Sequence, residues 1–167
     1  MKYRFCPLCG QRLEGRMLGD EGLVPYCESC TRPFFDSFTT CIIVAVADEY
    51  DKIAVLKHAG SKGTYRGLVA GYIKPGETAE ETARREVAEE LGLSVGRLAL
   101  VQTYWFEPGD QLMIGFIART QHGEFSLSGE IEAAEWMTAS HAQNHMRPGG
   151  PAWRLVECYM HELAKKG

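Results

Sequence analysis

The stretch GYIKPGETAEETARREVAEELGL, residues Gly71–Leu93, decides the fold of this chain. Five residues separate Gly71 from Glu77, and seven more separate Glu77 from the pair that follows it. The remaining fixed positions are Arg85, Glu86, Glu89, Glu90, Gly92 and Leu93. Pro75-Gly76 supplies a fixed and a positive φ, as a tight turn requires. The pattern therefore predicts a glycine-bearing loop whose backbone folds against the start of a helix.

The second half of this stretch predicts a helix over residues 79–91. Thr78, with Glu81 three residues later, has the pattern of a capping box, and Gly92 has that of a terminating glycine. The intervening run is rich in Ala, Glu and Arg, which are good helix formers. One face of this helix is apolar at four-residue intervals and should be buried. Its members are Ala83, Val87 and Leu91.

Three carboxylates crowd one side of the predicted helix. Glu86 and Glu90 lie one turn apart and Glu89 adjoins them, so like charges repel one another. Glu89 and Glu90 also lie in the C-terminal half, where the helix dipole disfavours anions. A hard divalent cation, Mg²⁺ or Mn²⁺, offsets both effects and is usual at phosphoryl-transfer sites. The alternative is a solvated acidic face, but the glycines and Glu77 at fixed offsets favour a metal site.

Arg85 is expected to connect the loop to the helix. It precedes Glu89 by four residues, a spacing that brings the two side chains together on a helix. It also lies within reach of Glu77, so a structural ion pair that holds the loop is its expected role.

The composition is that of an ordinary globular protein, with 45% hydrophobic and 24% charged residues. The net charge of −4 argues against a generally basic surface for nucleic acids, although a local patch remains possible. No apolar run approaches the roughly 20 residues that span a bilayer, so no membrane partner is expected. The first residues lack the apolar segment of a signal peptide, which predicts a cytoplasmic protein.

Four of the six cysteines form two C-x-x-C pairs near the start of the chain. They are Cys6, Cys9, Cys27 and Cys30. Two such pairs around a short polar stretch predict a zinc ribbon, whereas either pair alone could be a redox centre. Four protein ligands leave no open coordination position, so the zinc should be structural. The predicted units are a zinc ribbon over residues 1–37 and a larger domain over residues 38–167.

The larger domain is predicted to combine a sheet with two helices. Hydrophobic patterns and turn signals indicate strands and one further helix. The strands are expected at residues 39–47, 52–57, 65–73, 97–106, 111–120 and 132–137, with a possible extension at 124–127. A helix is expected at residues 151–165, with proline at its start. Cys41 and Cys158 lie in apolar runs and are expected in the core.

The segment Gly71–Leu93 resembles the Nudix signature G-x5-E-x7-R-E-U-x-E-E-x-G-U, where U is a bulky aliphatic residue, and every position is present. This resemblance implies an α/β fold, the Nudix α/β/α sandwich with a mixed sheet, preceded here by a small zinc ribbon. It also implies a Mg²⁺-dependent hydrolase of nucleoside diphosphates linked to another group. The catalytic motif residues would be Glu77, Arg85, Glu86, Glu89 and Glu90, with the last three as Mg²⁺ ligands.

A four-cysteine ribbon before such a domain resembles the NADH pyrophosphatase branch of the family. That branch cleaves NAD(H) to nicotinamide mononucleotide and AMP, and it can remove NAD caps from RNA. Its motif S-Q-P-W-x-F-P, followed by Leu-Met, corresponds to residues 101–113 here. The Ser and the first Pro are absent, and the spacing to Leu112-Met113 is about two residues longer. ADP-ribose, dinucleoside polyphosphates and capped RNA 5′ ends therefore compete with NADH as the substrate.

The same resemblance points to further site residues. Glu130 matches the position of an extra metal ligand or general base, although it could be a surface acid at the start of a strand. Tyr72 matches an aromatic residue that stacks on the substrate base. Lys74 replaces an acidic residue and could meet a phosphate directly. Trp105 and Phe106 are the other stacking candidates, and each aromatic residue could instead belong to the core.

Two expectations concern partners and rival functions. The resemblance implies a homodimer supported by the ribbon, with a nucleotide as the small-molecule substrate. The rival reading is a zinc-ribbon binding or regulatory protein on an inactive Nudix scaffold. Such a protein would be expected to lack carboxylates of the signature, and none is missing here.

Overall fold

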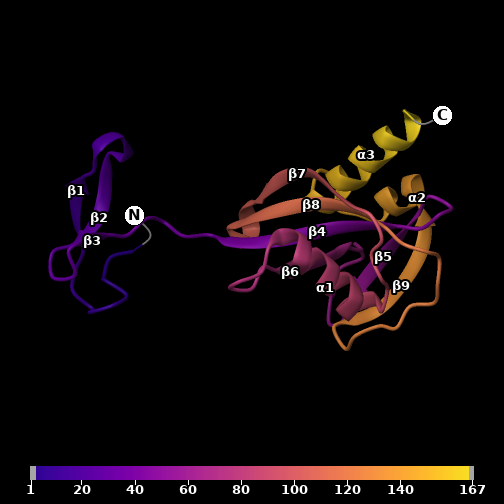
Figure 1. Cartoon of the computed structure of the whole chain (residues 1–167), viewed down its shortest axis with the longest axis horizontal. Coiled ribbons are helices and arrows are strands. Elements are labelled where there is room, and N and C mark those ends of the chain that lie inside the picture. Colours follow the sequence, from indigo (N-terminus) through magenta and orange to yellow (C-terminus); the bar gives the residue numbers. More distant parts are fainter. Residues whose placement is uncertain (1–2, 166–167) are drawn as a thin grey trace. The chain divides into compact units, whose positions relative to one another are not determined.

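The computed structural model describes residues 3–165 of the chain (Figure 1). The chain divides into two compact units, and the boundary between them in the sequence lies between Phe38 and Thr39. Each unit has its own sheet and is described by itself. Within residues 3–165, the longest apolar stretch of any helix is too short to cross a bilayer.

The first unit is a small antiparallel sheet in the order β1-β2-β3. Its strands are β1 (Glu14–Met17), β2 (Leu23–Cys27) and β3 (Arg32–Pro33), and a 3₁₀ turn, η1 (Gly19–Glu21), joins the first two. Only a few of its apolar side chains are buried, chiefly Cys6, Val24, Tyr26 and Cys27. A core this small does not stabilise a fold alone, so the unit needs an additional constraint such as a bound metal.

The second unit is built on a six-stranded mixed sheet. Its strands are β4 (Thr39–Ala47), β5 (Lys52–His58), β6 (Val69–Tyr72), β7 (Leu98–Phe106), β8 (Gln111–Arg119) and β9 (Ile131–Thr138). The order is β7-β8-β4-β5-β9, and β6 also pairs with β4. The β4–β8 pair is parallel and the other pairs are antiparallel. The central strand β4 is buried along most of its length, as its apolar sequence predicts.

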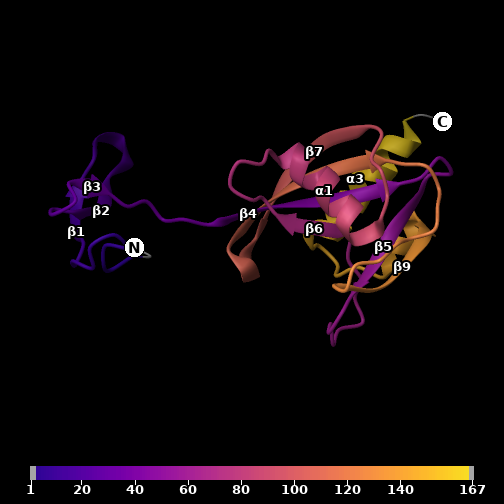
Figure 2. The same cartoon turned by 60° about the horizontal axis from the view of Figure 1, so that its bottom comes forward.

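Helices cover both faces of this sheet (Figures 1 and 2). Alternate residues of β4 face opposite sides, so Ile42 and Val44 pack toward α1 (Ala79–Leu91) while Ile43 and Ala45 pack toward the other face. There the cover is α2 (Ala139–Asn144) and α3 (Pro151–Ala164). The predicted α/β/α sandwich with a mixed sheet is therefore confirmed.

The expected strand at residues 124–127 is wrong. This segment is irregular, and its backbone binds the C-terminal end of α1 instead of a strand. The N–H of Ser126 donates to the carbonyl of Leu91 (2.9 Å) and that of Ser128 to the carbonyl of Glu90 (3.4 Å). The last carbonyls of a helix lack partners within the helix, so they compete with a sheet edge for these donors.

Three smaller expectations also need correction. The strand predicted at residues 65–73 is shorter, because only Val69–Tyr72 pairs with β4. The helix α2 was not predicted, since its six residues are too few for a clear periodic pattern. Cys158 is only partly buried, whereas Cys41 lies in the core as expected. On α3 the fully buried positions are Leu155, Val156 and Tyr159.

Candidate active site

The helix α1 begins and ends where local sequence predicts, at Ala79 and Leu91. Thr78 Oγ1 accepts from the N–H of Glu81 (3.2 Å), and Glu81 Oε2 accepts from the N–H of Thr78 (2.8 Å). This reciprocal pair is the predicted capping box. At the other end Gly92 is left-handed, with φ 69°, and its N–H donates to the carbonyl of Ala88. Both caps fix the register of the carboxylates on the helix.

Gly71 allows the sheet to approach the helix closely. It lies in β6 opposite Ile42, on the face that α1 covers. A Cβ atom at Gly71 would lie 2.1 Å from the carboxyl group of Glu86, which is shorter than any real contact. The signature glycine therefore makes space for the Glu86 side chain between β6 and α1.

Arg85 joins the loop before α1 to three carboxylates. Its Nε and Nη2 donate to the two carboxylate oxygens of Glu77 (2.7 and 2.9 Å), a bidentate ion pair. Its Nη1 donates to Glu86 (2.6 Å) and Glu89 (2.9 Å), and its Nη2 also donates to the carbonyl of Tyr72 (3.2 Å). The ion pair expected between Arg85 and Glu77 is present and holds the loop against the helix.

The Arg85 guanidinium lowers the pKa of Glu77 to about 2. Hydrogen bonds from Thr82 Oγ1 (2.9 Å) and from the N–H of Lys74 (3.2 Å) act in the same direction. Thr82 is fully buried, and no local pattern in the sequence indicates its contact with Glu77. Glu77 is therefore a permanently charged structural anchor at neutral pH.

Glu90 has the opposite environment from Glu77. Its side chain is only 4% exposed, and its Oε2 has no hydrogen-bond partner among the described residues. Burial raises the pKa of Glu90 to about 8, and the negative charges of Glu86, Glu130 and Glu89 act in the same direction. A hydrogen bond with the backbone of Ala70 acts in the opposite direction and lowers this pKa. A buried carboxylate oxygen without a donor is costly unless a proton or a cation satisfies it.

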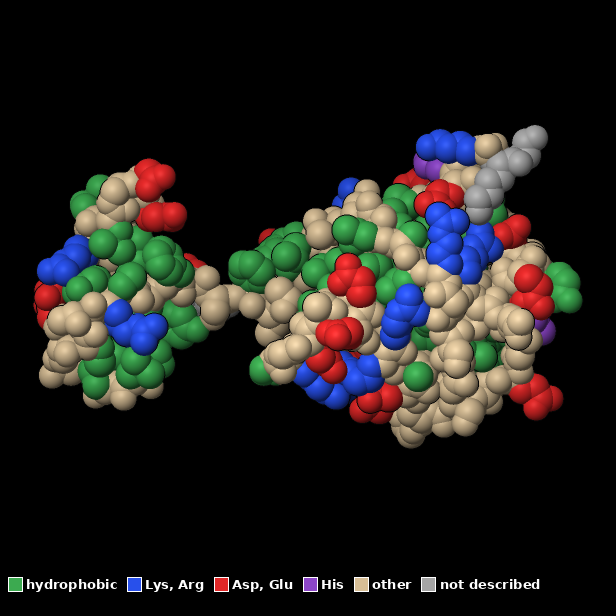
Figure 3. Space-filling view, in the orientation of Figure 1, with side chains coloured by type: hydrophobic (Ala, Val, Ile, Leu, Met, Phe, Trp, Pro, Cys, Tyr) green, Lys and Arg blue, Asp and Glu red, His purple; other side chains and the backbone are tan. Residues whose placement is uncertain are grey.

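These carboxylates line one cavity of about 530 Å³. Its walls come from β6, the loop before α1, α1 itself and residues 128–130. The side chains that line it include Tyr72, Lys74, Arg85, Glu86, Glu89, Glu90 and Glu130. Glu130 reaches this cavity because the preceding segment binds the C-terminal end of α1. In Figure 3, acidic and basic side chains lie next to one another on the surface of the larger unit.

The residues of this cavity fit a hard divalent cation. The unpartnered Oε2 of Glu90 faces a group of carboxylates that repel one another, and Mg²⁺ or Mn²⁺ would neutralise them. Two cations also line the cavity, Lys74 and Arg85, and Arg85 is already engaged with Glu77, Glu86 and Glu89. Glu86, Glu89, Glu90 and Glu130 are thus the groups that could hold a metal, with room in the cavity for a substrate.

Of the aromatic candidates, only Tyr72 lines this cavity. This residue is 58% exposed, and its hydroxyl accepts a hydrogen bond from Gln111 Nε2 (2.8 Å). Trp105 and Phe106 line a separate cavity of about 300 Å³, between the β7–β8 turn and residues 147–151. As consecutive residues of β7 they face opposite sides of the sheet, and Phe106 packs against the core under α3. The sequence does not predict that Gln111 contacts Tyr72, because the two residues are 39 positions apart.

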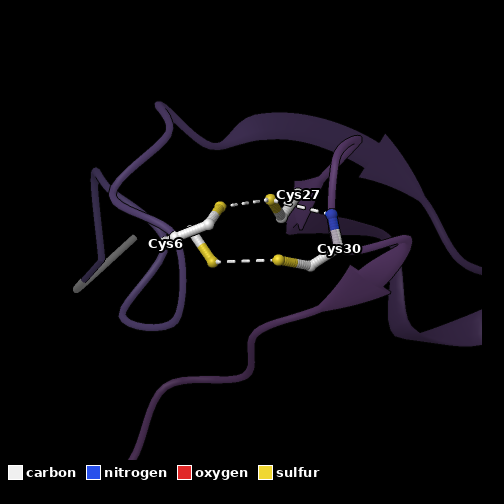
Figure 4. Close-up of side chains that lie close together, drawn as sticks. Cys6, Cys27 and Cys30 are labelled. Carbon is white, nitrogen blue, oxygen red and sulfur yellow. Dashed lines mark hydrogen bonds between the residues drawn. The ribbon is translucent and has the colours of Figure 1, made fainter.

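The four cysteines of the first unit converge on one point. Three of them, Cys6, Cys27 and Cys30, are labelled in Figure 4. Their sulfur atoms lie within 4.8 Å of one another, and the contacts Cys6–Cys30 and Cys9–Cys27 measure 3.9 and 3.6 Å. Zinc–sulfur bonds of about 2.3 Å in a tetrahedron place sulfur atoms roughly 3.8 Å apart. The cluster therefore has the dimensions of a structural zinc site. The neighbouring thiol of Cys9, together with burial, raises the pKa of Cys30 to about 12, so a cation is needed to hold four thiolates.

The chain belongs to the Nudix family: the model of the NUDIX domain matches residues 38–154. Among curated proteins it is similar to the NAD-capped RNA hydrolase NudC of Salmonella paratyphi C, with 30% identity over 161 residues. NudC proteins of other Salmonella strains match equally well. The alignment covers 93% of this chain and 59% of NudC, so the chain spans less than two thirds of these relatives.

Solved structures support the same fold. A NUDIX hydrolase from Nitrosomonas europaea aligns with a TM-score of 0.73 and 20% identity over 98% of this chain and 93% of that chain. The NUDIX domain of Shewanella oneidensis NrtR in complex with ADP ribose aligns with a TM-score of 0.66 and 15% identity. This alignment covers 83% of this chain and 94% of that chain. An Ap4A hydrolase of C. elegans aligns with a TM-score of 0.64 and 17% identity, over 76% of this chain and 98% of that chain. At these identities the likeness concerns the fold alone.

Proposed function

We propose that this protein is a metal-dependent Nudix pyrophosphohydrolase that cleaves a nucleoside diphosphate linked to another group, giving two monophosphates. The observation that carries the proposal is the environment of Glu90. A buried, unpartnered carboxylate oxygen lies among three further carboxylates at an open cavity, and Mg²⁺ or Mn²⁺ would satisfy it. Groups with strongly shifted pKa values in a cavity are typical of functional sites.

Each residue of the cavity has a role in this proposal. Glu86, Glu89 and Glu90 hold the cation, which when bound neutralises charge on the pyrophosphate oxygens. Arg85 and Glu77 position Glu86 and Glu89 through the ion pairs described above. Glu130 is exposed at the far wall, where its carboxylate can accept a proton from the attacking water. Lys74 lines the same cavity and can bind a substrate phosphate.

We infer that the preferred substrate is an NAD-type dinucleotide, either free or as the 5′ cap of an RNA. The similarity to NudC over nearly the whole chain supports this choice. Tyr72 also supports it, because an exposed ring held at its hydroxyl by Gln111 can stack on a base without further ordering. The structural neighbours that bind ADP ribose or act on Ap4A make these two compounds the alternatives.

A substrate panel tests this proposal. The zinc-loaded protein is incubated with Mg²⁺ and NADH, NAD⁺, ADP-ribose, Ap4A or NAD-capped RNA, and the products are separated by chromatography. We expect nicotinamide mononucleotide and AMP from NADH, with the highest kcat/KM in the panel. A higher kcat/KM for ADP-ribose or Ap4A would move the assignment to that substrate. If the folded, metal-loaded protein hydrolyses none of these compounds, the result would support a regulatory or binding function instead.

We also propose a homodimer. On the edge strand β7, Leu100 is 61% and Trp105 is 53% exposed, an apolar character that favours burial against a second copy. Light scattering coupled to size-exclusion chromatography measures the mass directly. We expect twice the chain mass of 18.6 kDa, and a single-chain mass at micromolar concentration would reject the dimer.

A further inference from the structure

Two histidines on the opposite face of the sheet from α1 lie in direct contact. His141 lies in α2, and His145 follows that helix at its C-cap, four residues later. Their Nε2 atoms are 3.0 Å apart, and their ring centroids are 4.9 Å apart. Side chains four residues apart share one face of a helix, which is why the two Nε2 atoms lie this close together.

The backbone around this pair is fixed on both sides. Ala142, between the two histidines, is fully buried, and so is Met146, which follows His145. The N–H of His145 donates to the carbonyl of Ala142 (3.0 Å), and its own carbonyl accepts from the N–H of Arg66 (2.8 Å). Because these contacts fix the backbone, the two rings lose little freedom when they bind a common ligand.

Two facing imidazole nitrogens at this distance have two physical explanations. Either one ring donates its N–H to the other, or both rings donate a lone pair to one metal ion. At metal–nitrogen distances of about 2.0–2.1 Å, nitrogens 3.0 Å apart subtend roughly 94° at the metal. This is close to the 90° between adjacent ligands of square-planar or octahedral ions, whereas a tetrahedral ion needs about 3.3 Å.

We propose that His141 and His145 chelate a divalent transition metal of the Ni²⁺ or Cu²⁺ type. Imidazole suits these ions, and the geometry favours them over tetrahedral Zn²⁺. Among residues 3–165, no further Cys, His, Asp or Glu completes a group of three with this pair. The remaining coordination positions are therefore filled by water or by a small exchangeable ligand.

This site is separate from both sites described above. α2 packs with α3 on the face of the sheet opposite α1, while the carboxylate cavity lies on the α1 side. It also differs in ligand chemistry, since Mg²⁺ prefers oxygen and does not compete well for imidazole. The proposal does not depend on the hydrolase activity.

Calorimetric titration with Ni²⁺ tests the pair. The protein is loaded with zinc at the cysteine cluster, and excess Mg²⁺ occupies the carboxylate cavity. We expect one saturable Ni²⁺ equivalent for the unchanged protein. His141→Ala and His145→Ala should each weaken this event about tenfold or more, because each removes half of the chelate. His161→Ala, which changes a histidine of α3 outside the pair, is the matched control and should bind as the unchanged protein does.

A second measurement uses the stability of the protein. Ni²⁺ should raise the Tm of the unchanged protein and of His161→Ala, but not that of the two pair variants. All variants should give the circular dichroism spectrum of the unchanged protein, which shows that they are folded. Ni²⁺ binding that persists in either pair variant, or the absence of any saturable event, would overturn the proposal and leave an ordinary hydrogen bond between the rings.

Discussion

The cysteine cluster and the carboxylate cavity both place groups that can carry negative charge side by side, but they differ in how the groups are enclosed. In the first unit four thiols from two turns enclose one point, with Cys6 and Cys27 buried. In the second unit three carboxylates come from one helix and a fourth from a distant loop, and Glu89 and Glu130 remain exposed. A closed set of four ligands suits a structural ion, whereas an open set leaves positions for substrate.

The two regions also differ in what holds them together without metal. The carboxylate side has Arg85, whose ion pairs with Glu77, Glu86 and Glu89 fix the loop to the helix. α1 is also covered by its own apolar core. On the cysteine side, the described residues from Tyr3 onward include few buried apolar side chains and no comparable cation within the cluster. Metal removal should therefore unfold the first region and leave the second folded.

The largest expected effect is the loss of zinc from the first unit. Cys27→Ser should release zinc and unfold that unit, because structural zinc contributes on the order of 10 kcal/mol in small domains. Zinc content by atomic absorption and amide NMR spectra measure the result. Cys158→Ser, which changes a cysteine outside the cluster, should keep its zinc. A folded first unit in zinc-free Cys27→Ser would contradict the comparison.

The second effect concerns turnover. Glu90→Gln should lower kcat by about a hundredfold or more, because the amide cannot supply the charge that holds the cation. Glu89→Gln should act in the same direction, and both variants should stay folded. Glu80→Gln is the matched control, since Glu80 is exposed on α1 and does not line the cavity. Near-normal turnover in Glu89→Gln or Glu90→Gln would refute the assignment.

The third effect is steric. Gly71→Ala would place a Cβ 2.1 Å from the carboxyl group of Glu86, so this side chain must move. We expect kcat to fall about tenfold to a hundredfold, with a loss of roughly 1–3 kcal/mol in unfolding free energy. Gly63→Ala, where a Cβ meets nothing closer than 3.9 Å, should change neither quantity. Equal behaviour of the two variants would mean that Gly71 does not make space for Glu86.

The last effect is a pH dependence that should appear only in the metal-free protein. Burial raises the pKa of Glu90 from 4.5 to about 8, so the folded state binds this proton more tightly than the unfolded state. Stability should therefore fall as the pH rises from about 4.5 to 8, by at most about 1.4 kcal/mol per pH unit. Urea unfolding with a chelator measures this slope.

Two comparisons isolate the contribution of Glu90 to this slope. Glu90→Gln should remove it, because an amide does not titrate in this range. Mg²⁺ should also suppress it, because the ion stabilises the charged form. A slope that is unchanged in Glu90→Gln would assign the titration to another group.

Local rules predicted those elements whose interactions lie close together in the sequence. The bounds of α1 follow from Thr78, Glu81 and Gly92, all within one turn of the helix ends. The strand β4 follows from its apolar run, and the cysteine cluster from two pairs of fixed spacing. Such interactions do not depend on the rest of the fold, so these elements can be predicted from the sequence alone.

Contacts between distant segments could not be predicted in this way. The burial of Glu90 depends on packing of α1 against β6, and the contact between Tyr72 and Gln111 joins residues 39 positions apart. Residues 124–127 were a possible extension of the sheet, but the N–H groups of Ser126 and of the nearby Ser128 donate to carbonyl groups at the end of α1 instead. No local sequence pattern shows whether a backbone N–H group will donate to the edge of a sheet or to the end of a helix.

The sequence by itself thus determined the carboxylates of α1, their caps and the four cysteines, because each depends on the geometry of a single turn. Only the tertiary structure decided that Glu130 joins those carboxylates, that Tyr72 but neither Trp105 nor Phe106 lines their cavity, and that His141 meets His145. The physical reason is that burial and cavity shape arise from the competition of many distant groups for the same partners.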